Sequence, residues 1–334
     1  MTGAALAFLC GTDLGPWDAG GLAAFHAGSP VLRYQYRKMA GWAGVEADAL
    51  LRPAGDGDAP RHPVAGRLAL ATAMLGIHDV LAAHRIRPGV LGGVGTGALV
   101  AASLAGALPR AELVRALMAG GAGTGDRAAS ALAFWPARSV PDWYRGAGCE
   151  EVRFGGALGR DTSGRYRVVL LTGERSALLR LAAAAPPGAV RPGGSDRCVV
   201  HDPLAREAQA RMRRLAAGLP FTAPRLPLCS ALEARTLCTA DEVRELFART
   251  VVEPADLDSG VAAMQAHGVR LGLVLGPSLP RNLLRFPFPV VPVESPEDLP
   301  HAIGALLELG VEASPAAHRA PGPAGAASGR GHPG

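Results

Sequence analysis

The chain is poor in lysine, in aromatic residues and in runs of like charge. Lys38 is its only lysine, and Phe, Trp and Tyr together make up 5% of its 334 residues. The formal net charge of +5 is spread along the chain, and no basic block is interleaved with aromatic side chains. This distribution argues against a nucleic-acid-binding surface. A modest positive charge instead suits an acidic protein partner or a phosphate-bearing ligand.

Cysteine is also scarce, and its spacing matches no ligand pattern. The sequence contains no C-x-x-C pair, so neither a zinc site nor a disulfide framework is indicated. We expect no metal and no bound cofactor. A reducing cytoplasm is the expected compartment. The five cysteines are Cys10, Cys149, Cys198, Cys229 and Cys238.

The sequence lacks a clear leader or membrane anchor. Residues 1–10 have no basic residue ahead of their short apolar run, unlike a signal peptide. Residues 90–108 are uncharged over the length of a membrane span, but their glycine cluster and the absence of flanking anchors favour a buried strand, turn and helix. We therefore expect no insertion into a membrane.

The hydrophobic pattern alternates between short apolar runs and stretches with helical periodicity. Strands that alternate with helices in this way predict an α/β fold with a parallel sheet. The expected strands are 4–9, 87–94, 166–173, 196–200, 226–231 and 269–277, and the expected helices are 66–85, 96–108, 109–119, 174–185, 201–219, 241–252 and 256–268.

The pattern also predicts how the chain divides. Residues 125–197 read as a small inserted α+β unit, and residues 1–124 together with 198–312 read as the α/β core. Residues 313–334 contain almost no large apolar side chain, and we expect this tail to be disordered.

Residues 91–108, LGGVGTGALVAASLAGAL, have the form of a catalytic turn: an apolar run, a glycine cluster and a helix of small residues. A strained strand-to-helix turn exposes a nucleophile, and the helix N-terminus favours negative charge beside it. The centre of this turn is Gly95, which has no side chain to offer.

Three segments carry a resemblance to a known family: residues 92–108 of the turn and helix, residues 198–232, CVVHDPLAREAQARMRRLAAGLPFTAPRLPLCSAL, and residues 274–284, VLGPSLPRNLL. In order and spacing they resemble the malonyl-CoA:acyl carrier protein transacylases of fatty acid synthesis, a family that includes the acyltransferase domains of polyketide synthases. The first segment lies over the family's A-G-H-S-L-G-E elbow without a gap, the second follows its histidine segment, and the third follows its closing strand and turn. The resemblance covers roughly residues 4–310. It implies a hydrolase-like α/β core with an inserted ferredoxin-like subdomain.

The resemblance also assigns site residues. His201 falls on the family's catalytic histidine, and Gly95 falls on the serine nucleophile, so no acyl ester can form there. The backbone N–H groups of Thr12 and Thr96 fall on the oxyanion donors. The carbonyl that orients the histidine ring is expected to be that of Thr250.

Four further positions depart from the family. Its elbow histidine falls on Val94 and its following glutamate on Ala98, and a glutamine of its Q-P-A segment falls near Gly66. The arginine that grips the malonyl carboxylate falls near Gly120. Because a guanidinium–carboxylate pair is a strong polar contact, its loss leaves a dicarboxylic acyl group without an obvious charge partner.

Three residues are candidates for a substitute nucleophile. Thr96 lies one residue after the family's serine position, so it could replace the serine or could simply be a turn residue at the start of the helix, and we favour the turn residue. Cys10 on the first loop and Cys198 near His201 are candidate thiols, for which core packing is the favoured role.

Two further patterns have competing interpretations. Gly93, Gly95 and Gly97 form a weak dinucleotide fingerprint, but no acidic residue follows at the right distance. Arg211, Arg213 and Arg214 suit an acidic carrier protein, or simply a solvated helix face, which we favour.

The sequence therefore suggests an acyltransferase-family protein of polyketide antibiotic biosynthesis. Its expected partners are an acyl carrier protein, acyl-CoA and a ketosynthase. Without a serine, His201 would act as a base toward a thiol or water on a bound thioester. The alternatives are a non-catalytic protein that binds the carrier, and a His201-dependent thioesterase that removes wrong acyl groups.

Overall fold

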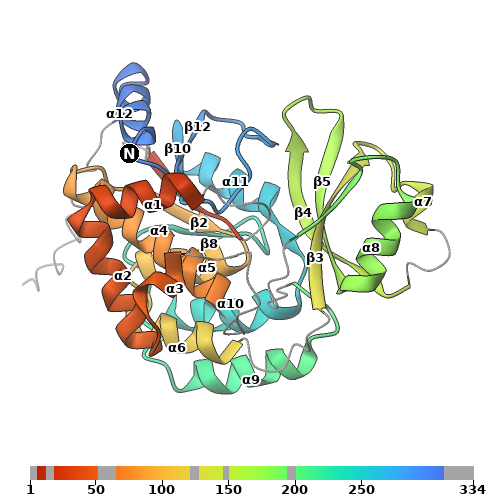
Figure 1. The fold of residues 1–334 in the computed structure, drawn as a ribbon, viewed down its shortest axis with the longest axis horizontal. Helices are drawn as coiled ribbons and strands as arrows, with labels where there is room; N and C mark the ends of the chain where they lie inside the picture. The colour runs from red at the N-terminus through yellow and green to blue at the C-terminus, as the bar shows by residue number, and fades with distance from the viewer. Residues whose placement is uncertain are drawn as a thin grey trace, which may run out of the picture.

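The computed structural model describes residues 6–12, 19–51, 65–120, 128–145, 150–193 and 201–311. It contains two separate six-stranded sheets, surrounded by helices (Figure 1). The first sheet contains β1, and the second contains β3. The strands are β1 (Leu6–Cys10), β2 (Val90–Gly93), β3 (Ala128–Pro136), β4 (Val152–Asp161), β5 (Tyr166–Glu174), β6 (Val190–Pro192), β7 (Leu228–Ser230), β8 (Thr236–Leu237), β9 (Ala255–Asp256), β10 (Leu271–Leu275), β11 (Leu284–Arg285) and β12 (Val290–Val293). The helices are α1 (Ala19–Gly28), α2 (Pro30–Ala43), α3 (Ala47–Leu51), α4 (Ala65–Ala83), α5 (Thr96–Leu104), α6 (Arg110–Gly120), α7 (Asp142–Arg145), α8 (Arg175–Ala184), α9 (Arg206–Ala217), α10 (Ala240–Val252), α11 (Leu257–Ala266) and α12 (Asp298–Glu308).

The first sheet has the strand order β12-β10-β1-β2-β7-β8. All neighbouring pairs are parallel except the edge pair β7–β8. Every residue of β1, β2, β7 and β10 is buried, as expected for parallel strands covered by helices on both faces. The α/β fold with a parallel sheet that the sequence predicts is confirmed.

The two faces of this sheet are covered by different elements. Leu6, Phe8 and Cys10 point into one core cluster together with α2, α4, α5 and α6. Ala7 and Leu9 point into a second cluster that α11 and the second sheet complete. In Figure 1, α11 accordingly lies between the two sheets. The alternation along β1 is the two-residue period of a strand.

Four strands of the second sheet, β3 to β6, come from an insertion with the element order β3-α7-β4-β5-α8-β6. These four strands pair antiparallel in the order β4-β5-β3-β6. The ferredoxin-like subdomain that the resemblance implies, a β-α-β-β-α-β unit, stays a prediction. Val168 and Leu170 face the core, whereas Val169 and Leu171 pack under α8. The bounds 125–197, and the disorder of 313–334, stay predictions because those ends lie outside the described residues.

Two short strands from outside the insertion connect the second sheet to the rest of the molecule. Strand β11 pairs with β4 antiparallel, and β9 pairs with β4 parallel, with Gly156 opposite Ala255. The segment that leaves α10 therefore runs directly into the edge of the second sheet.

The longest apolar helix belongs to the core. Gly66–Ala83 of α4 is long and apolar enough to cross a membrane, but 78% of that stretch is buried inside the fold. Its neighbours are α2, α3, α5 and α6. We interpret α4 as a buried helix of the core, and its apolar composition follows from its contact with other helices.

The sequence predicted most of the central elements and missed several others. The expected helix at 201–219 begins only at Arg206, because residues 201–205 form turns that are held against the end of α10. The helices α1 to α3, the strands β3 and β4, and α12 were not predicted. The expected strand 196–200 lies outside the described residues.

Gly93 and Gly97 allow the backbones of β1, β2 and α5 to approach one another closely. A Cβ atom on Gly97 would overlap the main-chain carbonyls of Cys10 and Gly11, and one on Gly93 would overlap the carbonyl of Cys10. The β1–β2–α5 junction therefore requires residues without side chains here.

We predict that Gly97→Ala lowers the free energy of unfolding by about 3 kcal/mol or more, because the overlap is with backbone that cannot rotate away. The matched control is Gly41→Ala, since Gly41 lies in helix α2 with nothing within 4 Å of an added Cβ. That change is expected to be neutral or to stabilise by up to about 1 kcal/mol. Urea unfolding of both variants tests the pair, and equal effects would contradict the close approach.

Candidate active site

The centre of the site is the turn between β2 and α5. β2 ends at Gly93, α5 begins at Thr96, and Gly95 is the N-cap with φ 58° and ψ −127°. A residue with a side chain would be strained here by about 1–3 kcal/mol, whereas glycine adopts the conformation freely. β2 and α5 are thus joined by a sharp turn whose apex carries only hydrogen.

The end of β1 lies directly beside this turn. Cys10 is paired with Gly93, and the N–H of Val94 donates to the carbonyl of Cys10 at 3.0 Å. The N–H of Gly11 donates to the buried hydroxyl of Ser278 at 2.9 Å, which fixes the loop after β1 against the turn after β10.

The two expected oxyanion donors come from these neighbouring strand ends. Thr12 is buried just past β1, and Thr96 is the first residue of α5. The first amides of a helix have no acceptor within the helix, so the N–H of Thr96 is free of the helical ladder. The oxyanion role of both residues stays a prediction.

His201 is buried, with 1% of its surface exposed, and its φ of 62° lies in the left-handed region. Its main-chain N–H donates to the carbonyl of Thr250 at 2.9 Å, and that of Asp202 donates to Val251 at 3.0 Å. These carbonyls belong to the last turn of α10, where helical partners are lacking. The end of one helix therefore seats the histidine backbone.

The expected role of Thr250 is wrong. The ring of His201 is oriented by the carbonyl of Glu253, which lies 2.6 Å from Nδ1. Because the carbonyl of Thr250 already accepts the main-chain N–H of His201, the ring bonds the carbonyl at the C-cap of α10, three residues later.

This bond fixes the tautomer of the imidazole. A carbonyl only accepts, so Nδ1 carries the proton and Nε2 of the neutral ring carries the lone pair. Burial lowers the pKa of His201 to about 4, although the bond to Glu253 opposes that shift. The ring is therefore neutral at pH 7, with its basic nitrogen at Nε2.

Nε2 is buried and has no hydrogen-bond partner among the described residues. Neither Thr96 nor Cys10 bonds it, so no described hydroxyl or thiol takes the place of the missing serine. Cys198 lies outside the described residues. The thiol of Cys10 is buried in the core, and burial raises its pKa far above the usual value. Cys10 is therefore a core residue, as the sequence favoured.

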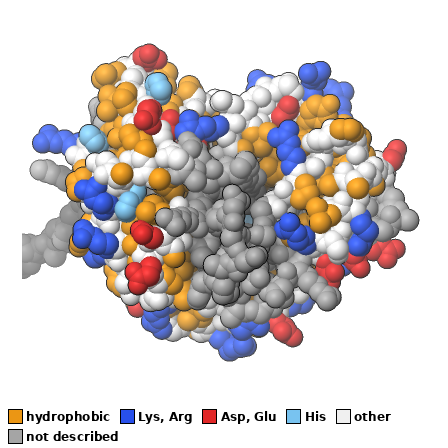
Figure 2. All heavy atoms as spheres, in the orientation of Figure 1, with side chains coloured by type: hydrophobic (Ala, Val, Ile, Leu, Met, Phe, Trp, Pro, Cys, Tyr) orange, Lys and Arg blue, Asp and Glu red, His pale blue; other side chains and the backbone are white. Residues whose placement is uncertain are grey.

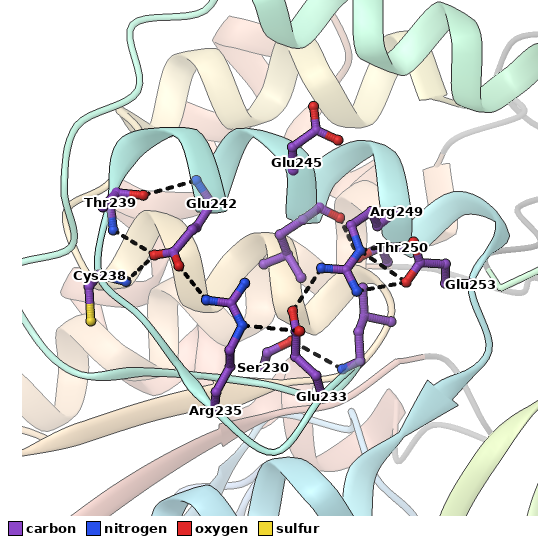
Figure 3. A network of polar contacts seen from close by, with 12 residues as sticks. Ser230, Glu233, Arg235, Cys238, Thr239, Glu242, Glu245, Arg249, Thr250 and Glu253 are labelled. Atoms are coloured by element: carbon purple, nitrogen blue, oxygen red, sulfur yellow. Dashed lines mark hydrogen bonds and ion pairs between the residues drawn. The ribbon is translucent and has the colours of Figure 1, made fainter.

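Ion pairs support the helix that orients the ring (Figure 3). Arg249 bonds the Glu253 carboxylate at 2.8 Å and the Glu233 carboxylate at 2.7 Å. Glu233 also pairs with Arg235 at 3.0 Å, and Arg235 forms a second ion pair with Glu242. The chain of charges thus joins both ends of α10.

Glu242 also closes the N-terminus of α10. It bonds the main-chain N–H of Thr239, whose hydroxyl accepts from the N–H of Glu242, which makes a capping box. The T-x-x-E spacing is visible in the sequence, and sequence reasoning missed it. Among the ion pairs across residues 233–253, only Arg249–Glu253 has the i,i+4 spacing of a local helix pair, and the pairs of Glu233 with Arg249 and of Arg235 with Glu242 have no comparable local signal.

The other candidate residues are placed as follows. The α9 arginines are partly paired with acidic residues of this chain, Arg213 with Glu245 at 3.4 Å and Arg211 with Glu207 at 4.0 Å. Figure 2 shows basic and acidic side chains interspersed over the face in view, with no single basic patch. Close packing on Cys10 accounts for Gly93 and Gly97 without a dinucleotide.

The four positions at which the sequence departs from the family lie in or beside three helices. Val94 and Ala98 are buried at the turn and in α5, Gly66 is in the first turn of α4, and Gly120 ends α6. None of these residues offers a polar side chain to a ligand.

Solved structures share this fold. A malonyl-CoA:acyl carrier protein transacylase from Xanthomonas oryzae is 21% identical with a TM-score of 0.72, over 91% of this chain and 99% of that one. The acyltransferase domain from the second module of the salinomycin polyketide synthase is 22% identical with a TM-score of 0.72, over 93% and 75%. A malonyl-transacylase in complex with a type II polyketide synthase acyl-carrier protein is 17% identical with a TM-score of 0.68, over 91% and 100%.

No protein-family model matches the chain, and no curated protein matches it in sequence. The structural neighbours show that the chain has the acyltransferase fold of fatty acid and polyketide synthesis.

We predict that His201 makes stability depend on pH. The unfolded imidazole takes a proton near pH 6.5 and the folded one near pH 4, so its contribution is present above pH 6.5 and is lost as the pH falls toward 4. The wild type should lose about 3 kcal/mol from this residue between pH 7 and pH 4. Urea unfolding across that range measures it. His201→Gln should flatten the dependence, and an unchanged slope in the variant would contradict a buried neutral ring.

Proposed function

We propose that the chain is a member of the transacylase family that acts on acyl thioesters of CoA or acyl carrier protein without an acyl-serine intermediate. The observation that carries this proposal is the buried Nε2 of His201, which has no described partner, together with glycine at the apex of the turn. Helix α10, which orients the imidazole, packs against α5, which starts at that turn. The helices that carry the two halves of the proposed site are therefore neighbours.

The chemistry is direct transfer between thiols. Nε2 of His201 takes the proton of the acceptor thiol, whose sulfur attacks the thioester carbonyl carbon. The bond from that carbon to the donor sulfur then breaks, and the imidazolium returns its proton to the departing thiolate. The amides of Thr12 and Thr96 stabilise the oxygen that becomes negative during attack. With water in place of the acceptor thiol, the same steps give hydrolysis.

A second candidate rests on the basicity of the ring. An imidazole with a pKa of about 4 is a weak general base at neutral pH. This favours a non-catalytic protein that binds the carrier and shields its thioester. The same fold and the same site residues serve either function, so turnover separates them.

The setting of the proposal is polyketide antibiotic biosynthesis in a reducing cytoplasm, with an acyl carrier protein and acyl-CoA as ligands and a ketosynthase as a neighbouring partner. The carrier is supported by a structural neighbour whose malonyl-transacylase is in complex with an acyl-carrier protein. The compartment is supported by the free thiols of Cys10, Cys229 and Cys238.

We predict that the wild type gains no acyl mass when incubated with acyl-CoA, because Gly95 has no oxygen to acylate. Gly95→Ser restores a hydroxyl at the apex and is expected to gain one acyl group, measured by intact mass. Gly95→Ala adds the Cβ without the oxygen and is the matched control. A stable acyl adduct on the wild type would refute the absence of covalent catalysis.

Thioester turnover distinguishes the candidate functions. We predict that acyl transfer from acyl-CoA to carrier protein falls at least about 100-fold in His201→Gln, while carrier binding is kept. Release of free acid by the wild type would identify water as the acceptor. Carrier binding with no turnover of either kind in the wild type would exclude both enzyme functions and leave the non-catalytic binder.

A further inference from the structure

Arg67 is a buried cation with no counter-ion among the residues that the structure describes. Only 8% of its surface is exposed, and among the described residues it is the one buried lysine or arginine. The buried acids Glu294 and Asp298, by contrast, are both paired with Arg281. A charge kept from water is costly unless it is paired, so Arg67 requires an explanation that the core does not provide.

The polar contacts of Arg67 are few for its five N–H donors. Nη1 donates to the carbonyl of Leu117 at 3.4 Å, and Nε is buried with no partner in the described part of the chain. Leu117 lies in the last turn of α6, where the helix dipole favours a cation by a fraction of a charge. One long hydrogen bond and a partial charge leave most N–H donors of the guanidinium fork without an acceptor among the described residues.

The fork lies at the edge of the sheet that carries the catalytic turn. Helix α4 leads into β2, so it begins at the carboxyl edge of the parallel sheet and ends at the other. Gly276, directly after β10, lies against Ala73 and Ile77 in the middle of α4. Arg67 is six residues before Ala73, which places it about 9 Å further along the helix, beyond the strand ends and on the side of Gly95.

We infer that Arg67 binds an oxyanion of the ligand, as a substrate-recognition residue of this site. The planar fork matches a pair of oxygens on a carboxylate or a phosphate. Two parts of an acyl thioester carry such groups: a carboxylate at the far end of a dicarboxylic acyl chain, and the phosphates of the CoA or carrier arm. The inference rests on the proposed function and names the charge that its substrate carries.

The assignment changes what the sequence implied about substrate. Gly120 removes the arginine that the resemblance leads one to expect on α6, yet the side chain of Arg67 reaches the last turn of that same helix from α4. A guanidinium is therefore present beside the end of α6, supplied by a different element.

Equilibrium binding tests the inference independently of turnover. The probes are non-hydrolysable thioether analogues of malonyl-CoA and propionyl-CoA, and a malonyl analogue on phosphate-free pantetheine. We expect Arg67→Met to weaken malonyl-CoA analogue binding about 10- to 100-fold, as for a lost charged hydrogen bond. Arg67→Lys should recover part of it. Arg115→Met is the matched control, because Arg115 is an exposed arginine of α6 paired with Glu112.

The three probes identify the source of the oxyanion. A loss confined to the two malonyl analogues supports the inference and assigns the acyl carboxylate. A loss on both CoA analogues but not on the phosphate-free one supports it and assigns a phosphate. Unchanged binding of all three by folded Arg67→Met would overturn it. If the wild type binds none of them, the proposed function itself fails.

Thermal unfolding of the ligand-free protein gives a second readout. Because an unpaired buried guanidinium is costly, Arg67→Met should raise the Tm of the free protein, and malonyl-CoA analogue should raise the Tm of the wild type more than that of the variant. A lower Tm in the free variant, with equal ligand effects on both proteins, would mean that a carboxylate of this chain neutralises Arg67, and would overturn the inference.

Discussion

The hydrogen bond from Nδ1 of His201 to the carbonyl of Glu253 is the constraint on which the site depends. It decides which nitrogen of a buried ring carries the proton, and therefore where the lone pair lies. The bond exists because α10 ends with carbonyls that lack helical partners, and two of them already seat the main chain of residues 201 and 202. The charges on Arg249, Glu253 and Glu233 hold that helix end in place.

The turn between β2 and α5 likewise depends on backbone geometry. Gly93 and Gly97 are required where β1, β2 and α5 approach one another, and Gly95 keeps the turn that a side-chain nucleophile would strain. Glycine at the apex therefore leaves the scaffold intact without strain. Under the proposed function, the site would hold a thioester carbonyl between two amide donors and a neutral imidazole, and it would act without the covalent half-reaction.

Sequence reasoning succeeded where the physics is local. The uncharged run through β2 and α5, and the apolar run of β10, were correctly placed as buried strand and helix because a parallel strand covered on both faces has no polar alternation. It failed where partners come from far away. Strand β4 carries glycines at bulges that break its pattern, and the choice of Glu253 over Thr250 depends on which carbonyls the backbone of His201 has already used. The burial of Arg67 follows from the packing of α4 on α6, which no local pattern in the sequence reveals.

The state of the His201 ring is the most direct measure of this arrangement. Nitrogen-15 NMR of protein labelled at histidine reports whether each ring nitrogen carries a proton, and His201→Gln identifies the signals. At pH 7 the ring should show a protonated Nδ1 and a bare Nε2, and it should stay neutral down to about pH 4. A proton on Nε2 at pH 7, whether in the opposite tautomer or in a charged imidazolium, would contradict the role of the Glu253 carbonyl and the chemistry built on it.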